Sequence, residues 1–211
     1  EAHPPGVTFS MPGSPIQFNS EGNNQTQQVT VSDQRGNTAT ITSPVIRIDW
    51  TAPVTTGAFT GTGVPGGTTQ WYKDSAQATL TRTDNLSGVR TTSYNIDGGT
   101  TQTYIAPFTI QTDGSHTISY WSSDKAGNNE TPQSWVVNVD VNAPVTQISA
   151  GNGYYADPAQ VTLTATDSGT GVANTFYQID GGATQTYSGP FAVSGDGSHQ
   201  IAYWSVDLAG H

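Results

Sequence analysis

The chain has 211 residues, and its formal net charge of -10 arises from 16 acidic side chains against only six Lys and Arg. This balance argues against nucleic acid and anionic membrane surfaces as partners, because both attract clustered cations. The absence of cysteine excludes disulfides, thiol catalysis and zinc–thiolate sites, and no apolar run approaches the roughly 20 residues that span a bilayer.

Residues 1–49 resemble the end of a repeat without its front strands. A shift of 91 residues brings "VSDQRGNTATITSPVIRIDWTAP", which starts at Val31, onto "SSDKAGNNETPQSWVVNVDVNAP", which starts at Ser122. A half sandwich exposes sheet edges and should not be stable alone. We therefore expect further residues, or a strand from an identical neighbouring chain, to complete it, as part of a longer or polymeric protein.

Residues 50–140 are predicted to form one complete repeat of short strands. Segments 76–84, 91–97, 115–124 and 132–140 alternate polar and apolar residues or carry β-branched and aromatic ones, with turn residues between them. The period of two predicts strands and argues against helices.

The connections within this repeat are predicted to be turns and short loops. The paired glycines of "IDGGT" predict a hairpin, because glycine accepts positive φ at little steric cost. "GTGVPGGT" (61–68) is predicted to be a Gly-rich loop insertion. The hydrophobic fraction of 33% suits strands that bury only alternate residues. The fold class predicted is all-β: tandem Ig-like or fibronectin-III-like antiparallel β-sandwiches.

Residues 141–211 duplicate the preceding repeat but stop before its last strand. A shift of 83 residues aligns 72–127 with 155–210, and 34 of these 56 positions are identical. Such self-similarity is a tandem duplication. The predicted organisation is the C-terminal half of a repeat at 1–49, a complete repeat at 50–140, and a repeat lacking its last strand at 141–211.

The motifs of residues 51–211 together resemble a known bacterial repeat. They include "TLTRTD", "YNIDGG", "QTY", "DGSH" and "YWSSDKAGN", most of which recur in the last repeat. This combination of motifs is similar to the outer-membrane-protein-type Ig-like repeat, which occurs in tandem in bacterial cell-surface and secreted proteins. Such repeats usually act as spacers, stalks or binding modules. The resemblance therefore implies an extracellular or cell-surface location and lowers the odds of catalysis.

Carboxylates gather at one end of each predicted sandwich. Strand A enters at this end and the B–C and F–G loops return to it, so an acid that ends one repeat should meet two loops of the next. The candidate metal ligands are Asp49, Asp84, Asp124 and Asn128 around the second repeat, and Asp140, Asp167 and Asp207 around the third.

Two interpretations of these carboxylates stay open. Calcium takes six to eight oxygen ligands, and a cation would relieve the repulsion among crowded carboxylates. Alternatively, each Asp only accepts hydrogen bonds from the backbone of its own turn, as Asp before Gly and Asn commonly does. Possible calcium is the one cofactor that the sequence suggests.

Aromatic and histidine residues also repeat. Of Tyr120–Trp121 and Tyr203–Trp204, one ring of each pair should face inward and one outward. His116 and His199 should each pack at a strand start and donate one hydrogen bond. The exposed turns that hold Asp97, Asp113, Asp180 and Asp196 show no sign of a glycosidase cleft. The residues predicted to pack between domains and stiffen the linkers are Trp50, Pro53 and Pro144.

The sequence favours a non-catalytic spacer, stalk or fibre segment of a bacterial cell-surface protein, such as an adhesin, or of a secreted protein. Its partners would be neighbouring repeats of the same or an identical chain. The alternative is a carbohydrate-binding accessory module of a secreted enzyme or adhesin, with a polysaccharide as ligand. A coplanar, solvent-facing pair of aromatic rings would favour sugar binding, whereas buried rings would favour the spacer.

Overall fold

The computed structural model describes residues 17–64, 70–151 and 153–211. Every regular helix or strand in these ranges is a β-strand, so the described chain offers no helix able to cross a membrane. The chain falls into two compact units. Unit 1 combines the described part of Glu1–Thr55 with Arg82–Thr92 and Trp121–Thr131, and unit 2 combines Thr56–Thr81, Ser93–Tyr120 and the described part of Pro132–His211.

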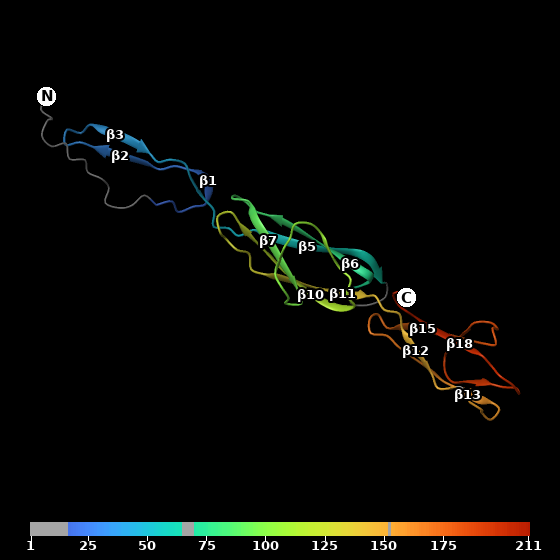
Figure 1. Cartoon of the computed structure of the whole chain (residues 1–211). Helices are drawn as coiled ribbons and strands as arrows, with labels where there is room; N and C mark the ends of the chain where they lie inside the picture. Colours follow the sequence, from blue (N-terminus) through green and yellow to red (C-terminus); the bar gives the residue numbers. More distant parts are fainter. Residues whose placement is uncertain (1–16, 65–69, 152) are drawn as a thin grey trace. The chain divides into compact units, whose positions relative to one another are not determined.

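Unit 1 contains two short antiparallel strand pairs (Figure 1). β1 pairs with β4, while β2 and β3 form a hairpin that buries Val31. The hairpin turn is closed by Asp33, whose Oδ1 accepts the amides of Arg35 and Asn37 at 2.8 and 2.9 Å. The strands are β1 (Gly22–Gln25), β2 (Gln28–Ser32), β3 (Thr38–Thr42) and β4 (Ile46–Ile48).

The repeat at residues 50–140 builds two layers of strands. β5, β6 and β9 are hydrogen-bonded neighbours, and β11, β10, β7 and β8 follow one another in the second layer. β10 alternates buried and less buried residues from His116 to Asp124, as the period of two predicted. The strands are β5 (Val54–Val64), β6 (Trp71–Thr83), β7 (Val89–Ile96), β8 (Gln102–Thr103), β9 (Phe108–Ile110), β10 (Gly114–Asp124) and β11 (Gln133–Asp140).

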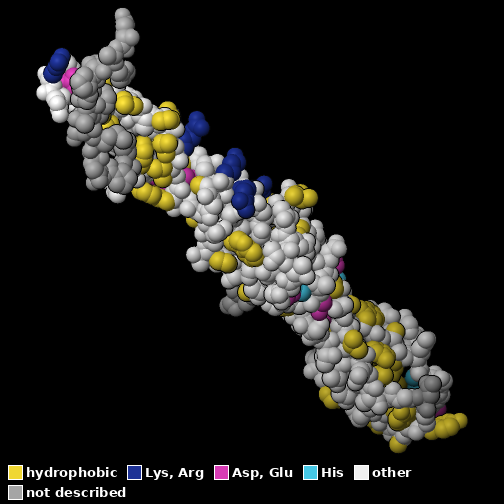
Figure 2. Space-filling view, turned by 60° about the vertical axis from the view of Figure 1, so that its left-hand side comes forward, with side chains coloured by type: hydrophobic (Ala, Val, Ile, Leu, Met, Phe, Trp, Pro, Cys, Tyr) yellow, Lys and Arg dark blue, Asp and Glu magenta, His cyan; other side chains and the backbone are white. Residues whose placement is uncertain are grey.

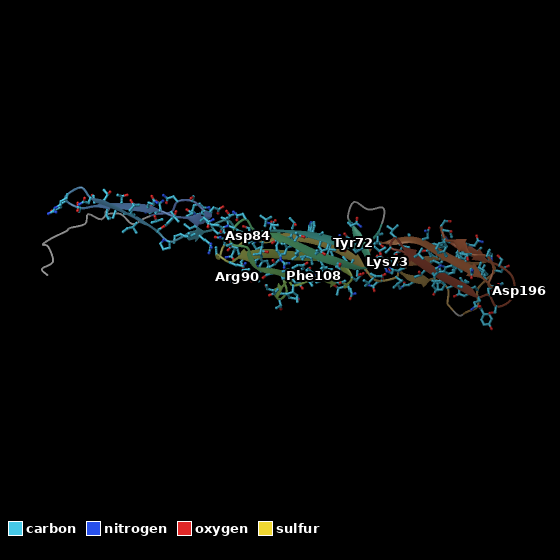
Figure 3. All side chains as sticks on the ribbon, turned by 90° about the horizontal axis from the view of Figure 1, so that it is seen from above. Tyr72, Lys73, Asp84, Arg90, Phe108 and Asp196 are labelled. Carbon is cyan, nitrogen blue, oxygen red and sulfur yellow. The ribbon has the colours of Figure 1, made fainter. Side chains whose placement is uncertain are left out.

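β6 links the two layers because it changes partner along its length. Its first residues, Trp71–Lys73, pair in parallel with β11, whereas Ala76–Ala78 pair antiparallel with β9. Between them Asp74 has a φ of 63°, a left-handed conformation that interrupts the extended ribbon. Tyr72 and Lys73 lie near the start of β6 and Asp84 follows its end (Figure 3). The parallel pair is a departure from the purely antiparallel sandwich predicted.

Apolar side chains from both layers meet in one core within unit 2. Tyr94 and Phe108 stack with ring centroids 3.9 Å apart and planes 9° apart. The Tyr104 hydroxyl accepts the buried backbone amide of Leu80 at 3.0 Å. The buried members of this core are Ala76, Ala78, Leu80, Tyr94, Tyr104, Ile110, Ile118, Tyr120, Val137 and Val139.

The third repeat uses the same strand plan. β12 pairs with β14, β13 with β17, and β15 lies between β16 and β18. Tyr177 and Phe191 repeat the ring stack, with centroids 3.9 Å apart and planes 12° apart. The strands are β12 (Val145–Ile148), β13 (Ala159–Val161), β14 (Leu163–Thr166), β15 (Val172–Ile179), β16 (Gln185–Thr186), β17 (Phe191–Val193) and β18 (Ile201–Asp207). The fold is therefore all-β, with Ig-like or fibronectin-III-like sandwiches as predicted.

One predicted loop is wrong in part. Residues 61–64 belong to the end of β5, because the chain continues its strand there, and 65–68 lie outside the described residues. Trp71 and Tyr72 begin β6, where Tyr72 packs against the core. The division into three repeats at 1–49, 50–140 and 141–211 stays a prediction.

Candidate functional site

Three of the predicted carboxylates meet inside unit 1. Asp49, Asp84 and Asp124 each offer an oxygen atom, and these atoms all lie within 4.8 Å of one another. Asp49 follows β4, Asp84 follows β6, and Asp124 ends β10, so the strand ends deliver the three side chains to one place. We call this group the Asp49 triad.

Asp124 is fully buried and held by its own loop. Its Oδ1 accepts the amides of Gly127 and Asn128 at 2.6 and 2.8 Å, and its Oδ2 accepts the Asn128 side-chain amide at 2.7 Å. Gly127 has a φ of 103°, which suits glycine in this turn. Burial raises the pKa of Asp124, but these hydrogen bonds outweigh burial and hold the pKa below its ordinary value of 3.8. Asp124 is therefore a carboxylate anion at neutral pH.

Asp84 keeps one oxygen without a partner. Its Oδ1 accepts the amides of Leu86 and Gly88 at 3.1 and 2.6 Å. Its Oδ2 is buried and makes no hydrogen bond among the described residues. A buried oxygen of this kind costs free energy unless a hydrogen-bond donor or a cation reaches it. This orphaned oxygen is the feature of the triad that turn capping leaves unexplained.

Asp49 connects the preceding strand pair to these loops. Its Oδ2 accepts the amide of Ser87 at 2.8 Å and its Oδ1 that of Thr51 at 3.1 Å. The Asn128 side-chain amide also donates to the Asp49 carbonyl oxygen at 3.0 Å. Asp49 thus meets both loops, and Asn128 joins them as an amide donor, while the binding of a metal by these residues stays a prediction.

Unit 2 contains a second version of the arrangement. Asp140 Oδ2 accepts the amide of Thr170 at 2.7 Å, as Asp49 does that of Ser87. Asp167 Oδ2 accepts the amides of Gly169 and Gly171 at 3.0 and 2.7 Å, and its Oδ1 is again buried without a partner among the described residues. A Cβ on Gly169 would lie 2.3 Å from the Asp140 carboxyl carbon, so this close approach requires glycine.

The metal-ligand geometry of unit 2 differs from that predicted. The atoms that lie within 4.8 Å of one another there belong to Asp140, Asp207 and His211, not to Asp167. His211 takes the place of Asn128: its Nδ1 lies 2.9 Å from Asp207 Oδ2, and its Nε2 lies 3.0 Å from Asp74 Oδ1. Burial lowers the pKa of His211, but the two carboxylates outweigh burial and raise the pKa above 6.5. Hydrogen bonds from the His211 amide and ring likewise overcome burial and lower the pKa of Asp207.

The predicted packing residues behave differently from one another. Pro53 is fully buried and Pro144 is half-buried. Trp50 is 56% exposed, and its packing between domains stays a prediction. The Trp50 backbone amide donates to Glu21 Oε2 at 3.3 Å. Glu21, which no sequence motif singles out, also accepts the Asn85 side-chain amide at 2.8 Å.

Two His–Asp pairs recur at the other turns. His116 Nδ1 lies 2.7 Å from Asp97 Oδ2 and His199 Nδ1 lies 2.8 Å from Asp180 Oδ2. Each ring also reaches a carbonyl oxygen through Nε2, so the single hydrogen bond predicted for each histidine is too few. Asp97 and Asp180 both have a φ of 52°, and the repeated "IDGG…DGSH" spacing was the signal for these pairs.

The aromatic pairs divide as predicted. Tyr120 is buried and Trp121 half-buried, while Trp204 is 38% exposed beside the half-buried Tyr203. Trp204 stacks on Phe176 of the neighbouring strand, with centroids 5.7 Å apart and planes 30° apart. The rings are therefore largely engaged with the protein itself.

Comparison with known proteins adds little. No protein-family model matches the chain, and no curated protein gives a significant match. A solved structure of Clostridium thermocellum CbhA fibronectin(III)-like modules is 14% identical, over 71% of this chain and 86% of that chain, with a TM-score of 0.28. A TM-score this low carries no argument, so the fold rests on the strands and their pairing.

Proposed function

We propose that this chain is a non-catalytic spacer of a bacterial cell-surface or secreted protein, built from repeats of the outer-membrane-protein Ig-like type. In this proposal, calcium bound at the Asp49 triad fixes the end of one repeat to two loops of the next. The observation that carries it is the triad itself: three neighbouring carboxylates, one of which has a buried oxygen without a partner among the described residues.

The residues of the triad fit calcium by chemistry and by electrostatics. All three side chains offer oxygen, the ligand type that calcium takes, and backbone carbonyls and water would complete its shell. Carboxylates whose oxygens lie within 4.8 Å of one another repel when they are ionised, and a cation bound among them would relieve this repulsion. A divalent cation would satisfy Asp84 Oδ2 and neutralise most of the local charge.

The second group of predicted ligands, Asp140, Asp167 and Asp207, supports the proposal less directly. His211 donates to Asp207 there and occupies the position that Asn128 holds in unit 1. Because calcium prefers oxygen ligands, a histidine in this place weakens the case for a second calcium ion. We therefore centre the proposal on the Asp49 triad.

The calcium proposal is tested by thermal unfolding with EDTA and with added calcium. We expect calcium to raise the melting temperature, because an ion that binds only the folded state stabilises it by mass action. The variant Asp84→Asn should lose this increment, because it removes the carboxylate with the free oxygen. Isothermal titration calorimetry of the same proteins would report the binding directly.

Asp33→Asn is the matched control. Asp33 caps a turn through two backbone amides and the Asn37 side chain, as Asp124 does through Asn128, but it lies in no described carboxylate cluster. This variant should lower the melting temperature and keep the full response to calcium. If neither calcium nor EDTA changes the melting temperature of the parent protein, the calcium proposal is wrong, and turn capping is the whole role of the three aspartates of the triad.

A further inference from the structure

The positive charges of this acidic chain are unevenly distributed. Unit 1 holds five of the six Lys and Arg against seven acids, a net charge of -2, whereas unit 2 holds one Lys against nine acids, a net charge of -8. Figure 2 shows several Lys and Arg side chains in dark blue on the drawn face. Most of the cations of the chain therefore belong to unit 1, although its net charge is still negative. The five cations of unit 1 are Arg35, Arg47, Arg82, Arg90 and Lys125.

Two of these cations line a pocket of about 610 Å³ in unit 1. Arg47 reaches it from β4 and Lys125 from the loop after β10, while Asn23 and Asn24 border it from β1. Ser87 lines it from the loop between β6 and β7. The volume lies within the range of about 300–1,000 Å³ that small-ligand sites occupy.

Several polar side chains of this pocket have no partner among the described residues. Neither Arg47 nor Lys125 forms an ion pair with any described carboxylate, and the side-chain amides of Asn23 and Asn24 make no hydrogen bond within the described chain. Ser87 Oγ is buried and likewise lacks a partner there. A buried hydroxyl without a partner is uncommon in folded proteins and points to a ligand atom or water that completes it.

We propose that this pocket binds an acidic sugar, a pyranose ring that carries a carboxylate such as a uronic acid unit. Arg47 and Lys125 would hold the carboxylate through charge-assisted hydrogen bonds, and Arg is suited to a bidentate contact. The Asn23 and Asn24 amides and the Ser87 hydroxyl match the ring hydroxyls, which both donate and accept.

Asp49 also lines the pocket and fits the same ligand class. Its two oxygens already accept the amides of Thr51 and Ser87. The one negative charge of Asp49 is smaller than the two positive charges of Arg47 and Lys125, so the charged side chains of the pocket sum to a positive charge. A carboxylate beside cations suits a ligand that combines hydroxyl donors with one negative charge. A purely anionic ligand such as a bare phosphate would gain nothing from Asp49. The inference does not require the spacer role, although the pocket and the Asp49 triad share Asp49.

The test is titration calorimetry of the whole chain with trigalacturonic acid, in EDTA so that calcium binding does not contribute. Neutral galactotriose and inorganic sulfate are the comparison ligands. We expect trigalacturonic acid alone to bind. Arg47→Gln and Lys125→Gln should each weaken its binding by about tenfold or more, the loss expected for one charge-assisted hydrogen bond.

Arg35→Gln is the control, because Arg35 is a cation of the same unit that lies outside the pocket lining. It should bind trigalacturonic acid as the parent protein does, and melting temperatures of all three variants would verify folding. No binding of trigalacturonic acid, equal binding of sulfate or galactotriose, or an equal loss of affinity in Arg35→Gln would each overturn the proposal. The calcium-dependent unfolding of the chain would be unaffected by any of these results.

Discussion

At the scale of single residues, one structural motif recurs: an aspartate whose carboxylate accepts hydrogen bonds from the loop that follows it. Asp33, Asp124 and Asp207 each accept two backbone amides with one oxygen and the side chain four residues later with the other. This structural motif explains why the sequence "SD…GN" returns along the chain. It also positions Asp124 within the Asp49 triad, so a turn-capping residue and a candidate calcium ligand are the same side chain.

The His–Asp pairs are the second recurring structural motif, and their pKa shifts have opposite directions. Burial lowers the pKa of His116, but hydrogen bonds to the Asp97 carboxylate and the Thr112 carbonyl outweigh burial and raise it above 6.5. The hydrogen bond from His116 lowers the pKa of Asp97 below 3.8. In the other pair the Asp180 hydrogen bond raises the pKa of His199, and His199 lowers that of Asp180.

These directions predict a pH dependence of stability. A raised histidine pKa stabilises the fold below the unfolded value of 6.5, and this stabilisation is lost as pH rises through the folded pKa. The lowered pKa of Asp97 stabilises the fold above 3.8 and loses its effect as pH falls through the folded value. The melting temperature of His116→Gln should therefore lie furthest below that of the parent protein at about pH 5.5, and the difference should be smaller at about pH 8.5. A difference that stays constant over this range would show that the ring acts by packing alone.

At the scale of elements, the two layers of the second repeat are joined by more than apolar contact. Tyr104, in the segment that follows β8, reaches across to accept the buried amide of Leu80 on β6. The hydroxyl thereby offers an acceptor to a backbone donor in the core. Its neighbour Tyr94 donates to Gln102 at 3.1 Å in a less buried place.

Removal of the two hydroxyls should have unequal effects. Tyr104→Phe would remove the hydroxyl that accepts the buried Leu80 amide and should destabilise the fold by about 1–3 kcal/mol. Tyr94→Phe removes a side-chain pair near the surface and should cost about 0.5–1.5 kcal/mol. Urea unfolding at an unchanged m-value would measure both. A smaller effect for Tyr104→Phe than for Tyr94→Phe would contradict this account of the layer contact.

The sequence predicted the elements better than it predicted their contacts. Period-two alternation located the strands at 76–84, 91–97, 115–124 and 132–140, because each strand buries every second side chain in the same core. It did not locate the change of partner within β6, because that depends on the left-handed conformation of Asp74, a residue type that also occurs in ordinary turns. The fold class could be predicted from the local alternation of residues along each strand. The parallel pairing of β6 with β11 depends on the packing of the whole repeat and could not.

The candidate site was predictable to a similar extent. The recurrence of aspartates at strand ends predicted that Asp49, Asp84 and Asp124 would meet, since the loops of a sandwich return to one end. The substitution of His211 for Asn128 was visible in the sequence, but its contact with Asp74 depends on the fold of β6. The pocket beside Asp49 was not predicted, because its residues come from four separate segments with no common spacing.

At the scale of the whole molecule, the proposed spacer role requires limited relative motion of the chain's parts, and calcium bound at the Asp49 triad would contribute to this. The triad joins residues on either side of the segment at 50–83, so an ion bound there restrains chain segments far apart in sequence. The chain has no cysteine, which makes it suited to paired spin labels at engineered cysteines. Thr38 on β3 and Thr101 before β8 are exposed and form no side-chain hydrogen bond among the described residues.

We predict that the distance distribution between labels at Thr38→Cys and Thr101→Cys narrows when calcium is added and broadens with EDTA. The physical reason is that a cation bound by all three carboxylates removes their repulsion and holds together the chain segments that carry them. The additional change Asp84→Asn should keep the distribution broad in calcium, whereas Asp167→Asn, its counterpart in unit 2, should leave the narrowing intact. Double electron–electron resonance measures the width directly. A width that is the same in calcium and in EDTA would mean that the triad does not stiffen the chain, even where calcium raises the melting temperature.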